Sequence, residues 1–394
     1  MRITYIHQHF MLPSEGGGSR PYEFARRMAR DGHEVTMICS GAEALDTTVD
    51  GIRVRRLDVP YENEMNSTQR LLSFARFMAR ASVAAARIPA DVVFASSTPL
   101  TVAVPGIVAK LVQRAPMVFE VRDLWPEVPI ELGYLNNPVA VRCARILEKV
   151  AYRSSAHVVA LSPAMGDGVK KVLPSTEVTV VPNASDVERF DLPVDARRTF
   201  RDAQGWSQPE TVVVYAGGFG KIYNLDWAVQ LAAELRDDPI RFVLIGQGSE
   251  SASLQKLAHK LGLDSVALFP GRLPRTEVAK YTAAADLVLS SVKNEPCLEA
   301  ASINKVFDGM AASRPIVLNH NGWLTDLVVE SGAGWKLDRD ISAAAENLRR
   351  LAHDPVGLER AGQISGQLGR EEFARERLYS QLMNVLTSTV EESK

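Results

Sequence analysis

Glycine-rich turns recur along this chain at positions where a phosphate could be bound. Residues 16–18 are three consecutive glycines, and Gly17 and Gly18 precede a helical pattern. Residues 215–221 read YAGGFGK and place Gly218 close to Lys221. Backbone amides at a helix start attract anions, glycines allow close approach, and a lysine adds positive charge that suits a pyrophosphate. The alternative for each segment is an ordinary tight turn with a solvated lysine.

Polar residues are densest between residues 294 and 315, which read NEPCLEAASINKVFDGMAASRP. A helix is predicted to begin near Ser302. Its first turn holds Asn304 and Lys305, and Asp308 follows one turn later. A carboxylate at this place can accept hydrogen bonds from sugar or ribose hydroxyls, and the lysine can neutralise a phosphate. The alternative is a capped helix whose lysine and acid are simply solvated.

These segments are positioned by a repeated alternation of short β-branched runs and longer helical patterns. The alternation predicts βαβ units, and a series of them predicts a parallel sheet covered on both faces. In such sheets ligands bind beyond the carboxyl ends of the strands, where the glycine turns and the 294–315 segment fall. The predicted strands are residues 3–6, 34–38, 91–95, 117–121, 157–161, 178–181, 211–215, 241–245, 266–269, 287–290 and 316–319.

The length of 394 residues predicts two domains. The stretch from Val187 to Pro209 is polar, contains Pro193 and has no strand pattern, so we interpret it as the domain boundary. After it the alternation restarts, and residues from about 340 to 386 have a wholly helical pattern. The prediction is an α/β fold of two open Rossmann-like sheets that face each other across a cleft, joined by a linker at residues 188–209.

Charge and cysteine content exclude several classes of protein. Lys and Arg total 45 and Asp and Glu total 47, a formal net charge of −2, so nothing predicts nucleic-acid binding. The three cysteines are far apart in the sequence, which disfavours disulfides or structural zinc and fits a reducing cytoplasm. The acid-x-acid sequence Asp338-Arg339-Asp340 precedes a helical pattern and is interpreted as a cap, so no metal or other cofactor is expected.

Neither a targeting segment nor a transmembrane segment is expected. The N-terminus lacks the apolar core of a signal peptide. The most apolar stretch, residues 99–112, is too short to span a bilayer and is interpreted as a buried helix. The glycine spacing differs from the dinucleotide fingerprint, which disfavours NAD. We therefore expect a cytoplasmic protein.

Five segments together resemble one known family. They are GGGSRP at residues 16–21, VRDLWPE at 121–127, VPNASD at 181–186, YAGGFGK at 215–221 and NKVFDGMAASRPIV at 304–317. In this order they resemble the GT-B retaining glycosyltransferases of family 4, and most closely the branch that assembles bacterial surface polysaccharides such as O-antigen and capsule. The last segment is the most specific of the five.

The resemblance implies that the two domains bind different substrates. Residues 1–187 would form an N-terminal acceptor-binding domain and residues 210–369 a nucleotide-sugar-binding domain. Residues 370–394 would form a helix that returns to the first domain. The implied reaction is a retaining, metal-independent transfer of a hexosyl or N-acetylhexosaminyl group from a nucleotide sugar, with UDP expected, to an acceptor hydroxyl. The implied acceptor is a polyprenyl-linked glycan intermediate.

The resemblance also implies roles for single residues. Gly17 and Gly18 correspond to the first glycine loop of the family. The arginine that usually follows the second glycine loop is missing, because Gly218 and Phe219 stand there. Lys221 is the substitute expected to hold the donor pyrophosphate and to stabilise leaving-group charge during catalysis.

The acidic residues of the family are matched only in part. Asp308 occupies the place of the acid that binds ribose, with Asn304 and Lys305 in the same donor-binding segment. Glu299 lies nine residues before Asp308, although the family spacing is eight, so Glu295 competes with it for the sugar contact.

The strand at residues 117–121 is often followed by a histidine in the family. This chain has Arg122 and Asp123 there. Asp123 is the candidate that contacts the transferred sugar, and its alternative role is to cap the turn that follows.

A basic, apolar segment at residues 67–89 predicts contact with an anionic membrane. It contains no acidic residue, and its large apolar side chains recur at helical spacing on one face. Arginines beside such a face suit lipid headgroups and would place the protein peripherally on the inner face of the cell membrane. The alternative is a helix whose apolar face is core. The arginines concerned are Arg70, Arg76 and Arg80, and the apolar residues are Leu71, Phe74 and Met78.

Three other functions remain open from the sequence. A transferase could act on a soluble small-molecule acceptor and would need no membrane helix. A GT-B nucleotide-sugar epimerase would need acids and histidines in the cleft, for which His7, His9 and His320 are candidates at strand ends. A non-catalytic sugar-nucleotide sensor would bind the donor without releasing nucleotide.

Overall fold

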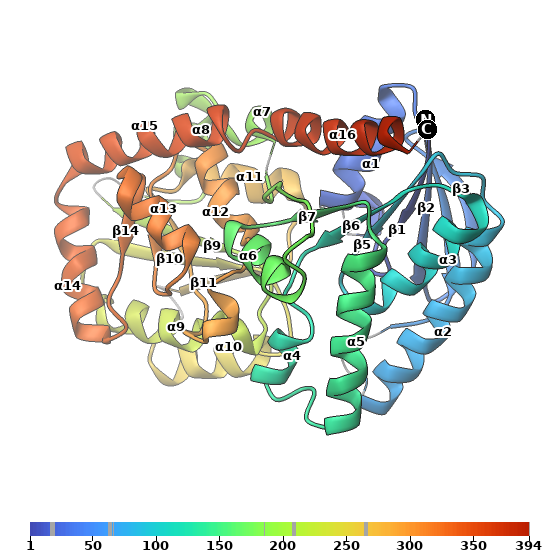
Figure 1. Ribbon diagram of the computed structural model, residues 1–394. Helices are drawn as coiled ribbons and strands as arrows, with labels where there is room; N and C mark the ends of the chain where they lie inside the picture. The colour runs from blue at the N-terminus through green and yellow to red at the C-terminus, as the bar shows by residue number, and fades with distance from the viewer. Residues whose placement is uncertain are drawn as a thin grey trace. The chain divides into compact units, whose positions relative to one another are not determined.

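The computed structural model describes residues 1–15, 20–61, 65, 67–184, 186–206, 210–263 and 267–393. The chain divides into two compact units, each built around its own sheet, which is mostly parallel in unit 1 and wholly parallel in unit 2 (Figure 1). Unit 1 comprises Met1–Pro182, Ala300–Ser302 and Leu378–Lys394, and unit 2 comprises Asn183–Glu299 and Ile303–Arg377. Two α/β units with parallel sheets confirm the predicted fold class.

The sheet of unit 1 has eight strands in the order β3-β4-β2-β1-β5-β6-β7-β8. Every pairing is parallel except β3 with β4, a hairpin that turns at Asp50 and Gly51. The strands are β1 Arg2–Ile6, β2 Glu34–Gly41, β3 Leu45–Val49, β4 Ile52–Asp58, β5 Val92–Ser96, β6 Met117–Val121, β7 His157–Ala160 and β8 Val178–Val180. The β3–β4 hairpin was not predicted, whereas the other strands coincide with predicted ones to within a few residues.

Helices cover both faces of this sheet. On one face α2, α3 and α5 share a single core with the strands, to which Phe77, Ala109 and Tyr152 contribute. Elsewhere α1 packs against α16, where Tyr379 lies 6.3 Å from Phe24 between ring centroids. The helices are α1 Arg20–Arg30, α2 Ser67–Ala86, α3 Ala103–Gln113, α4 Glu127–Glu131, α5 Pro138–Ser154, α6 Pro163–Val172 and α16 Arg375–Glu392, with short 3-10 helices η1 Pro13–Glu15 and η2 Leu100–Val102.

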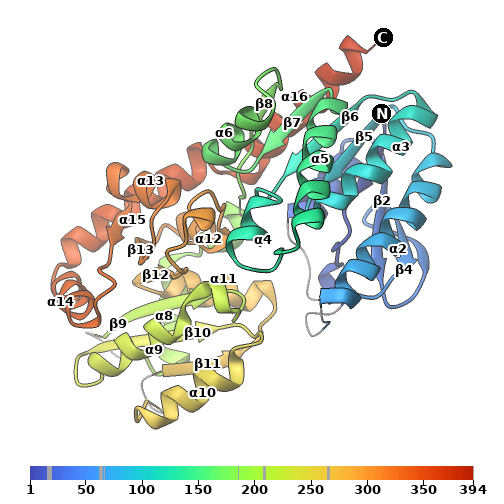
Figure 2. The ribbon, with the colours of Figure 1, turned by 60° about the horizontal axis from the view of Figure 1, so that its bottom comes forward.

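The sheet of unit 2 has six parallel strands in the order β11-β10-β9-β12-β13-β14. Successive residues of β9 pack on opposite faces of the sheet, since Val213 packs with α9 and α10 while Val212 packs with α8 and α11. Figure 2 shows the helices of unit 2 around its sheet. The strands are β9 Thr211–Ala216, β10 Ile240–Ile245, β11 Ala267–Gly271, β12 Leu287–Ser290, β13 Ile316–Leu318 and β14 Gly334–Lys336. The helices are α7 Val187–Phe190, α8 Val194–Ala203, α9 Leu225–Glu234, α10 Ser251–Lys260, α11 Arg275–Ala284, α12 Asn304–Ala311, α13 Trp323–Ser331, α14 Ile341–Ala352 and α15 Pro355–Glu371, with η3 Lys221–Tyr223 and η4 Pro296–Leu298.

The segment expected to be an irregular linker is largely helical. Residues 188–206 lie within unit 2, where the rings of Phe200 and Tyr281 are 4.9 Å apart and Arg201 pairs with Asp286 at 2.9 Å. The chain passes from unit 1 to unit 2 earlier, after Pro182. Pro193 had favoured an irregular linker, but it stands at the N-cap of α8, where a proline does not break the helix.

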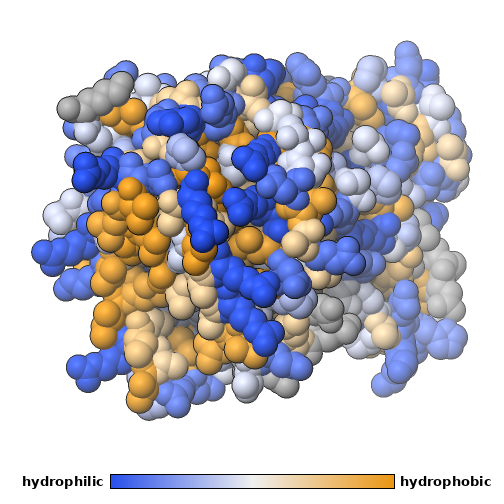
Figure 3. Space-filling view, turned by 90° about the vertical axis from the view of Figure 1, so that its right-hand side faces the viewer, coloured by the Kyte–Doolittle hydropathy of each residue, from blue (hydrophilic) through white to orange (hydrophobic). Residues whose placement is uncertain are grey.

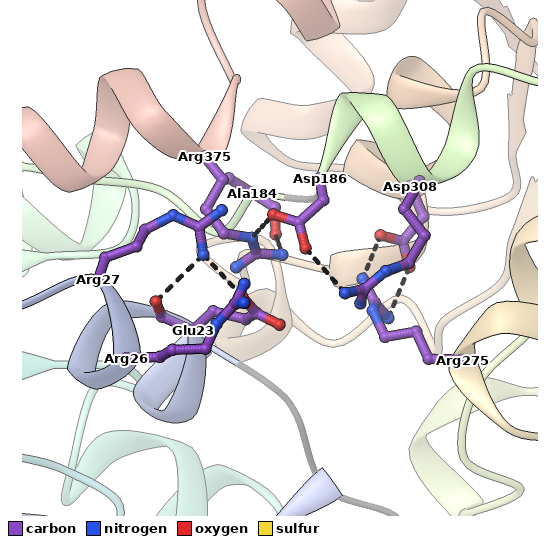
Figure 4. Close-up of polar contacts among 9 residues, drawn as sticks. Glu23, Arg26, Arg27, Ala184, Asp186, Arg275, Asp308 and Arg375 are labelled. Carbon is purple, nitrogen blue, oxygen red and sulfur yellow. Dashed lines mark hydrogen bonds and ion pairs between the residues drawn. The ribbon is translucent and has the colours of Figure 1, made fainter. Parts of the chain in front are cut away.

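The return to unit 1 begins at α16. Its first residue, Arg375, belongs to unit 2, where its guanidinium donates to Asp186 Oδ1 at 2.7 Å and to the Ala184 carbonyl at 2.6 Å (Figure 4). From Leu378 onward the helix belongs to unit 1, where the Tyr379 hydroxyl donates to Asp31 at 2.7 Å. Residues 370–374, which were predicted to start this helix, end α15 and form the turn after it.

Candidate functional site

The strand order of each unit creates one crevice at the carboxyl ends of its strands. The order reverses between β1 and β5 in unit 1, and between β9 and β12 in unit 2. Ligands of open parallel sheets bind at such switch points, because the loops that leave the two neighbouring strands diverge there. The loops after β1, β5 and β6 therefore form a candidate site in unit 1, and the loops after β9 and β12 form a separate candidate site in unit 2.

The glycine turns after β9 and β10 pack against each other. A Cβ on Gly246 would lie 1.8 Å from the Gly217 carbonyl oxygen, and one on Gly248 would lie 2.5 Å from that of Phe219. The amides of Gly217 and Phe219 donate to carbonyls of the β10 segment at 2.9 and 3.0 Å. These two amides are therefore used inside the protein, and the glycines of the second turn are required for loop packing.

Lys305 lies beneath the first of these turns. Its ammonium lies 4.5 Å from the ring centroid of Tyr215 and 4.6 Å from that of Tyr223, and a Cβ on Gly217 would approach its Cε to 3.2 Å. The residue is only 6% exposed. Burial lowers the pKa of Lys305 to about 7, although the nearby Asp308 carboxylate opposes the shift.

The Lys305 ammonium has no hydrogen-bond acceptor or ion-pair partner among the described residues. Two aromatic faces stabilise its charge, but they leave its three N–H donors unused. A buried cation in this state gains strongly from contact with an anion. The arrangement at the unit 2 switch point is therefore suited to a phosphate.

Asp308 is held by an arginine that the sequence analysis did not single out. Arg275, the first residue of α11, donates Nη2 to Asp308 Oδ1 at 2.7 Å and Nη1 to Oδ2 at 3.3 Å (Figure 4). The guanidinium also lies 5.2 Å from the ring centroid of Phe190. A forked pair uses one lone pair on each carboxylate oxygen, so each oxygen can still accept a hydrogen bond from a hydroxyl. No local sequence motif predicts a role for Arg275, because only the fold places it next to Asp308.

The remaining donor candidates are solvent-exposed on unit 2. Lys221 begins η3 directly after the glycine turn and is exposed, as are Gly218 and Asn304. Glu295 and Glu299 flank η4 and are exposed as well. The cation that the structure buries at the switch point is thus Lys305, although the sequence analysis gave Lys221 the leading role.

A buried polar network supports the loops after β12 and β13. The Ser290 hydroxyl lies 3.0 Å from His320 Nε2, and His320 Nδ1 lies 3.0 Å from the Asn321 carbonyl. Asn319 donates to Ser291 Oγ at 2.9 Å. Burial lowers the pKa of His320 to about 4, so the ring is neutral. Both ring nitrogens are engaged, which makes His320 a structural brace of the loop.

Unit 1 has a buried ion pair of its own at the matching edge. Arg20 donates Nε to Glu120 Oε1 at 2.9 Å, and the Ser96 hydroxyl donates to Glu120 Oε2 at 2.6 Å. Glu120 is fully buried. This pair was not predicted, although the single acid inside the apolar run VFEV of β6 could have indicated it. The ion pair fixes the start of α1 to the end of β6.

Asp123 follows β6 at the same edge of the sheet. Burial raises the pKa of the Asp123 carboxyl to about 6, and the positive charge of Arg122 limits the shift. His9, after β1, lies 4.5 Å from Tyr61 between ring centroids, and burial lowers its pKa to about 4. Gly17 and Gly18, the other predicted residues of this edge, lie outside the described residues.

No group of three or more His, Cys, Asp and Glu side chains within the described part of the chain could hold a metal ion. The Lys305 ammonium lies beside the glycine turn, where a Cβ on Gly217 would lie 3.4 Å from its Nζ. Together with the start of α12, it could stabilise negative charge on a phosphate at this edge.

Two family models match the chain in succession. Residues 15–184 match the glycosyl transferase 4-like domain, and residues 196–366 match glycosyl transferases group 1. A protein of Escherichia coli K12 named as the colanic acid biosynthesis glycosyl transferase WcaI is 28% identical over 42% of this chain and 42% of its own length. The glycosyltransferase EpsD of Bacillus subtilis 168 is 25% identical over 52% of both chains. The chain spans about half the length of the curated relatives it matches.

Solved structures share the fold along nearly the whole chain. Sucrose-phosphate synthase from Thermosynechococcus elongatus matches with a TM-score of 0.80 at 17% identity and covers 98% of both chains. Anabaena HepE in complex with UDP and glucose matches with a TM-score of 0.74 at 18% identity, over 98% of this chain and 100% of its own. WaaG, a glycosyltransferase involved in lipopolysaccharide biosynthesis, matches with a TM-score of 0.73 at 16% identity, over 98% of this chain and 99% of its own.

Proposed function

Because the chain belongs to the GT-B glycosyltransferases, we propose that it transfers a sugar from a nucleotide donor to an acceptor hydroxyl with retention and without a metal ion. The observation that carries this proposal is the buried Lys305 ammonium at the switch point of unit 2, which has no hydrogen-bond or ion-pair partner within the described part of the chain. UDP is the proposed nucleotide, and the structures of HepE in complex with UDP and with UDP-glucose support it.

The direct test is a screen of nucleotide sugars. A ligand that binds only the folded state raises its melting temperature, so UDP- and GDP-linked sugars can be ranked by the shift they cause. Incubation of the best donor with candidate acceptors should release free nucleotide. Binding without release would instead support a sensor, and a changed sugar without release would support an epimerase. His7 and His320 weigh against an epimerase, because both nitrogens of each ring are already engaged within the protein.

Within the donor site we propose that Asp308 accepts hydrogen bonds from the ribose hydroxyls and that Lys305 contacts the pyrophosphate. Arg275 keeps the Asp308 carboxylate oriented. The rest of the proposed donor-binding set comprises the exposed residues Gly218, Lys221, Glu295 and Asn304, together with Gly17 and Gly18, which lie outside the described residues. Lys221 and the exposed Glu299 are also proposed catalytic residues.

The Asp308→Asn variant is expected to weaken UDP binding by about tenfold, because a neutral amide accepts more weakly from ribose and pairs poorly with Arg275. UDP should lose more affinity than inorganic pyrophosphate, which lacks ribose. Isothermal titration of both ligands measures the difference. Asp226→Asn, the same change at an exposed position of α9, is the control. Equal UDP affinity in wild type and Asp308→Asn would show that the ribose assignment is wrong.

For the acceptor we propose a lipid-linked glycan intermediate of polysaccharide synthesis, bound by unit 1. The names of the relatives WcaI and WaaG, which refer to colanic acid and lipopolysaccharide, support this class of acceptor. A curated relative from Streptomyces kanamyceticus, 23% identical over 53% of this chain, is a 2-deoxystreptamine glucosyltransferase. It supports the alternative of a small soluble acceptor.

Helix α2 is the proposed membrane contact, although part of its surface is buried or paired within unit 1. Phe77 is fully buried, Phe74 stacks on Tyr61 at 5.6 Å, and Arg80 pairs with Asp58 at 3.7 Å. The face that was predicted to meet lipid is therefore partly core. No helix among the described residues has the length and apolar character that a bilayer crossing requires.

What remains free on α2 is a mixed apolar and basic surface. Leu71 and Leu72 are 67% and 48% exposed near the start of the helix, and Arg76 is exposed beside them. Figure 3 shows this side of unit 1, where orange apolar groups border blue hydrophilic ones. A hollow of about 360 Å³ adjoins the helix and is lined by Arg55, Leu57, Ala79, Arg80, Val83, Ala84 and Arg87. Three arginines around apolar groups suit an anionic headgroup region.

Wild type is expected to float with anionic vesicles and to be released by high salt, because exposed charge attraction is screened. The Arg70→Glu, Arg76→Glu, Arg80→Glu triple variant should lose flotation and keep UDP binding. The same reversal at Arg236, Lys256 and Lys260, which are exposed on unit 2, is the control. Equal flotation of wild type and the α2 variant would exclude this helix as the contact and favour the soluble acceptor.

A further inference from the structure

The unit 1 switch point contains a cation that the donor site does not use. Arg122 follows β6, and its backbone amide donates to Ser97 Oγ at 3.0 Å in the loop after β5. Its guanidinium lies 3.0 Å from His7 Nε2 in the loop after β1. Arg122 therefore joins the ends of all three strands that border the crevice of this unit.

The hydrogen bonds fix the tautomer of His7. A guanidinium can only donate, so His7 Nε2 must accept from Arg122 and carry no hydrogen. His7 Nδ1 then carries the hydrogen and donates to the Ser96 carbonyl at 3.1 Å. His7 is 4% exposed, and burial, assisted by the charge of Arg122, lowers its pKa well below the usual range. His7 is thus a neutral acceptor that orients a charged arginine.

The charge of Arg122 is not neutralised by a contact. Among the residues that the structure describes, no carboxylate forms an ion pair with Arg122, and its guanidinium has only the His7 ring as a hydrogen-bond partner. Four of its five N–H donors remain available. Arg20, by contrast, forms a buried ion pair with Glu120 in the same unit. An oriented, unpaired guanidinium at a strand-end crevice has the geometry that binds phosphate in a forked manner.

We propose that Arg122, positioned by the neutral ring of His7, is the anion site of unit 1 and binds a phosphate or pyrophosphate group carried by the acceptor. This proposal rests on the transferase function proposed above. It places a second anion site in the protein, separate in sequence and in unit from Lys305. His7 is a positioning residue, since it acts only through Arg122.

The donor also carries phosphates, so the test must separate the two sources. Inorganic pyrophosphate is titrated into protein already saturated with UDP, which occupies the donor site. Wild type should bind pyrophosphate under this condition. Arg122→Gln should bind it about 10- to 100-fold more weakly, the effect of losing a charge-assisted forked contact, and should keep its UDP affinity. Arg153→Gln, the same change at an exposed arginine of α5, should behave as wild type.

Two variants of His7 test the positioning role. His7→Gln retains an acceptor for Arg122 and a donor for the Ser96 carbonyl, so it should keep most of the pyrophosphate affinity. His7→Leu offers neither and should lose affinity nearly as fully as Arg122→Gln. UDP affinity reports whether each variant is folded. Equal pyrophosphate affinity in His7→Leu and wild type would overturn the role of His7.

The proposal as a whole fails if UDP-saturated wild type binds no pyrophosphate, or if Arg122→Gln binds it as well as wild type. In either case Arg122 would only join the three loops. If wild type does not bind UDP, the proposed transferase function fails instead. The anion site is then still judged by titrating pyrophosphate into wild type and Arg122→Gln without nucleotide.

Discussion

The Lys305→Met variant is expected to bind UDP about 10- to 100-fold more weakly than wild type. Methionine is an unbranched side chain one atom shorter, so it can still pack beside the Tyr215 and Tyr223 rings, but it lacks the ammonium that lies over them. The loss corresponds to roughly 1.5–3 kcal/mol for a hydrogen bond to a charged group. Uridine, which has no phosphate, should bind the variant and wild type equally. Lys256→Met, at an exposed position of α10, is the matched control.

The same residue should make UDP binding depend on pH. The pKa of Lys305 is lowered to about 7 by burial, so the free protein loses this charge as the pH rises above 7. A bound phosphate would raise the pKa of Lys305 again. Above pH 7, the neutral Lys305 of the free protein therefore takes up a proton when UDP binds. Affinity should then fall by up to about tenfold per pH unit above 7 in wild type and stay flat in Lys305→Met.

Calorimetry in buffers of different ionisation enthalpy measures the proton uptake directly. Wild type should take up close to one proton on binding UDP at pH 8 and almost none at pH 6. Lys305→Met should take up none at either pH. A pH-independent affinity in wild type, or identical curves for the two proteins, would contradict the assignment of Lys305 to the pyrophosphate.

The Asp123→Asn variant is expected to lose about 10- to 100-fold in turnover while gaining stability at neutral pH. The loss follows if the carboxylate accepts a hydrogen bond from the transferred sugar, since an amide accepts more weakly. The gain follows because the pKa of Asp123 is raised from 3.8 to about 6, so holding it ionised costs free energy. A shift of this size corresponds to about 3 kcal/mol.

The sign of the stability effect follows from the raised pKa. The carboxyl favours the folded state below its unfolded pKa of 3.8, and this contribution is lost as the pH rises through about 6. Asp123→Asn should therefore melt higher than wild type at pH 7.5 and at a similar temperature at pH 4. Asp167→Asn, exposed on α6, should show neither effect. Unchanged turnover in Asp123→Asn would remove this residue from the proposed catalytic set.

The sequence predicted the strands that lie inside each sheet better than those at its edges. Runs such as residues 92–95 of β5 and 287–289 of β12 are apolar throughout because both faces are covered, and such runs are easily recognised. The β3–β4 hairpin is half-exposed and charged, so its pattern resembles a loop, although the Asp50-Gly51 turn was a usable signal. The short edge strand β14 was missed for a similar reason, since only Gly334 of its three residues is buried.

The candidate site could be predicted as segments but not as contacts. The glycine turn after β9 and the helix start at Asn304 were located, because turn chemistry and helix starts are local properties. The pairing of Arg275 with Asp308 and of Arg122 with His7 joins residues 33 and 115 positions apart. Only the order of strands and helices in space creates such neighbours. The neutral state of His7 likewise depends on burial that no local sequence encodes.

Unit 1 contains residues from both early and late parts of the chain, and this affects the order in which the protein can fold. Leu382 and Leu386 of α16 are fully buried, and Tyr379 completes contacts with Phe24 and Asp31 of unit 1. These residues leave the ribosome only after the whole of unit 2. Unit 2 therefore can complete its core first, while unit 1 keeps an apolar surface uncovered until translation reaches α16. During that interval the uncovered apolar surface makes unit 1 the part of the chain most prone to aggregate.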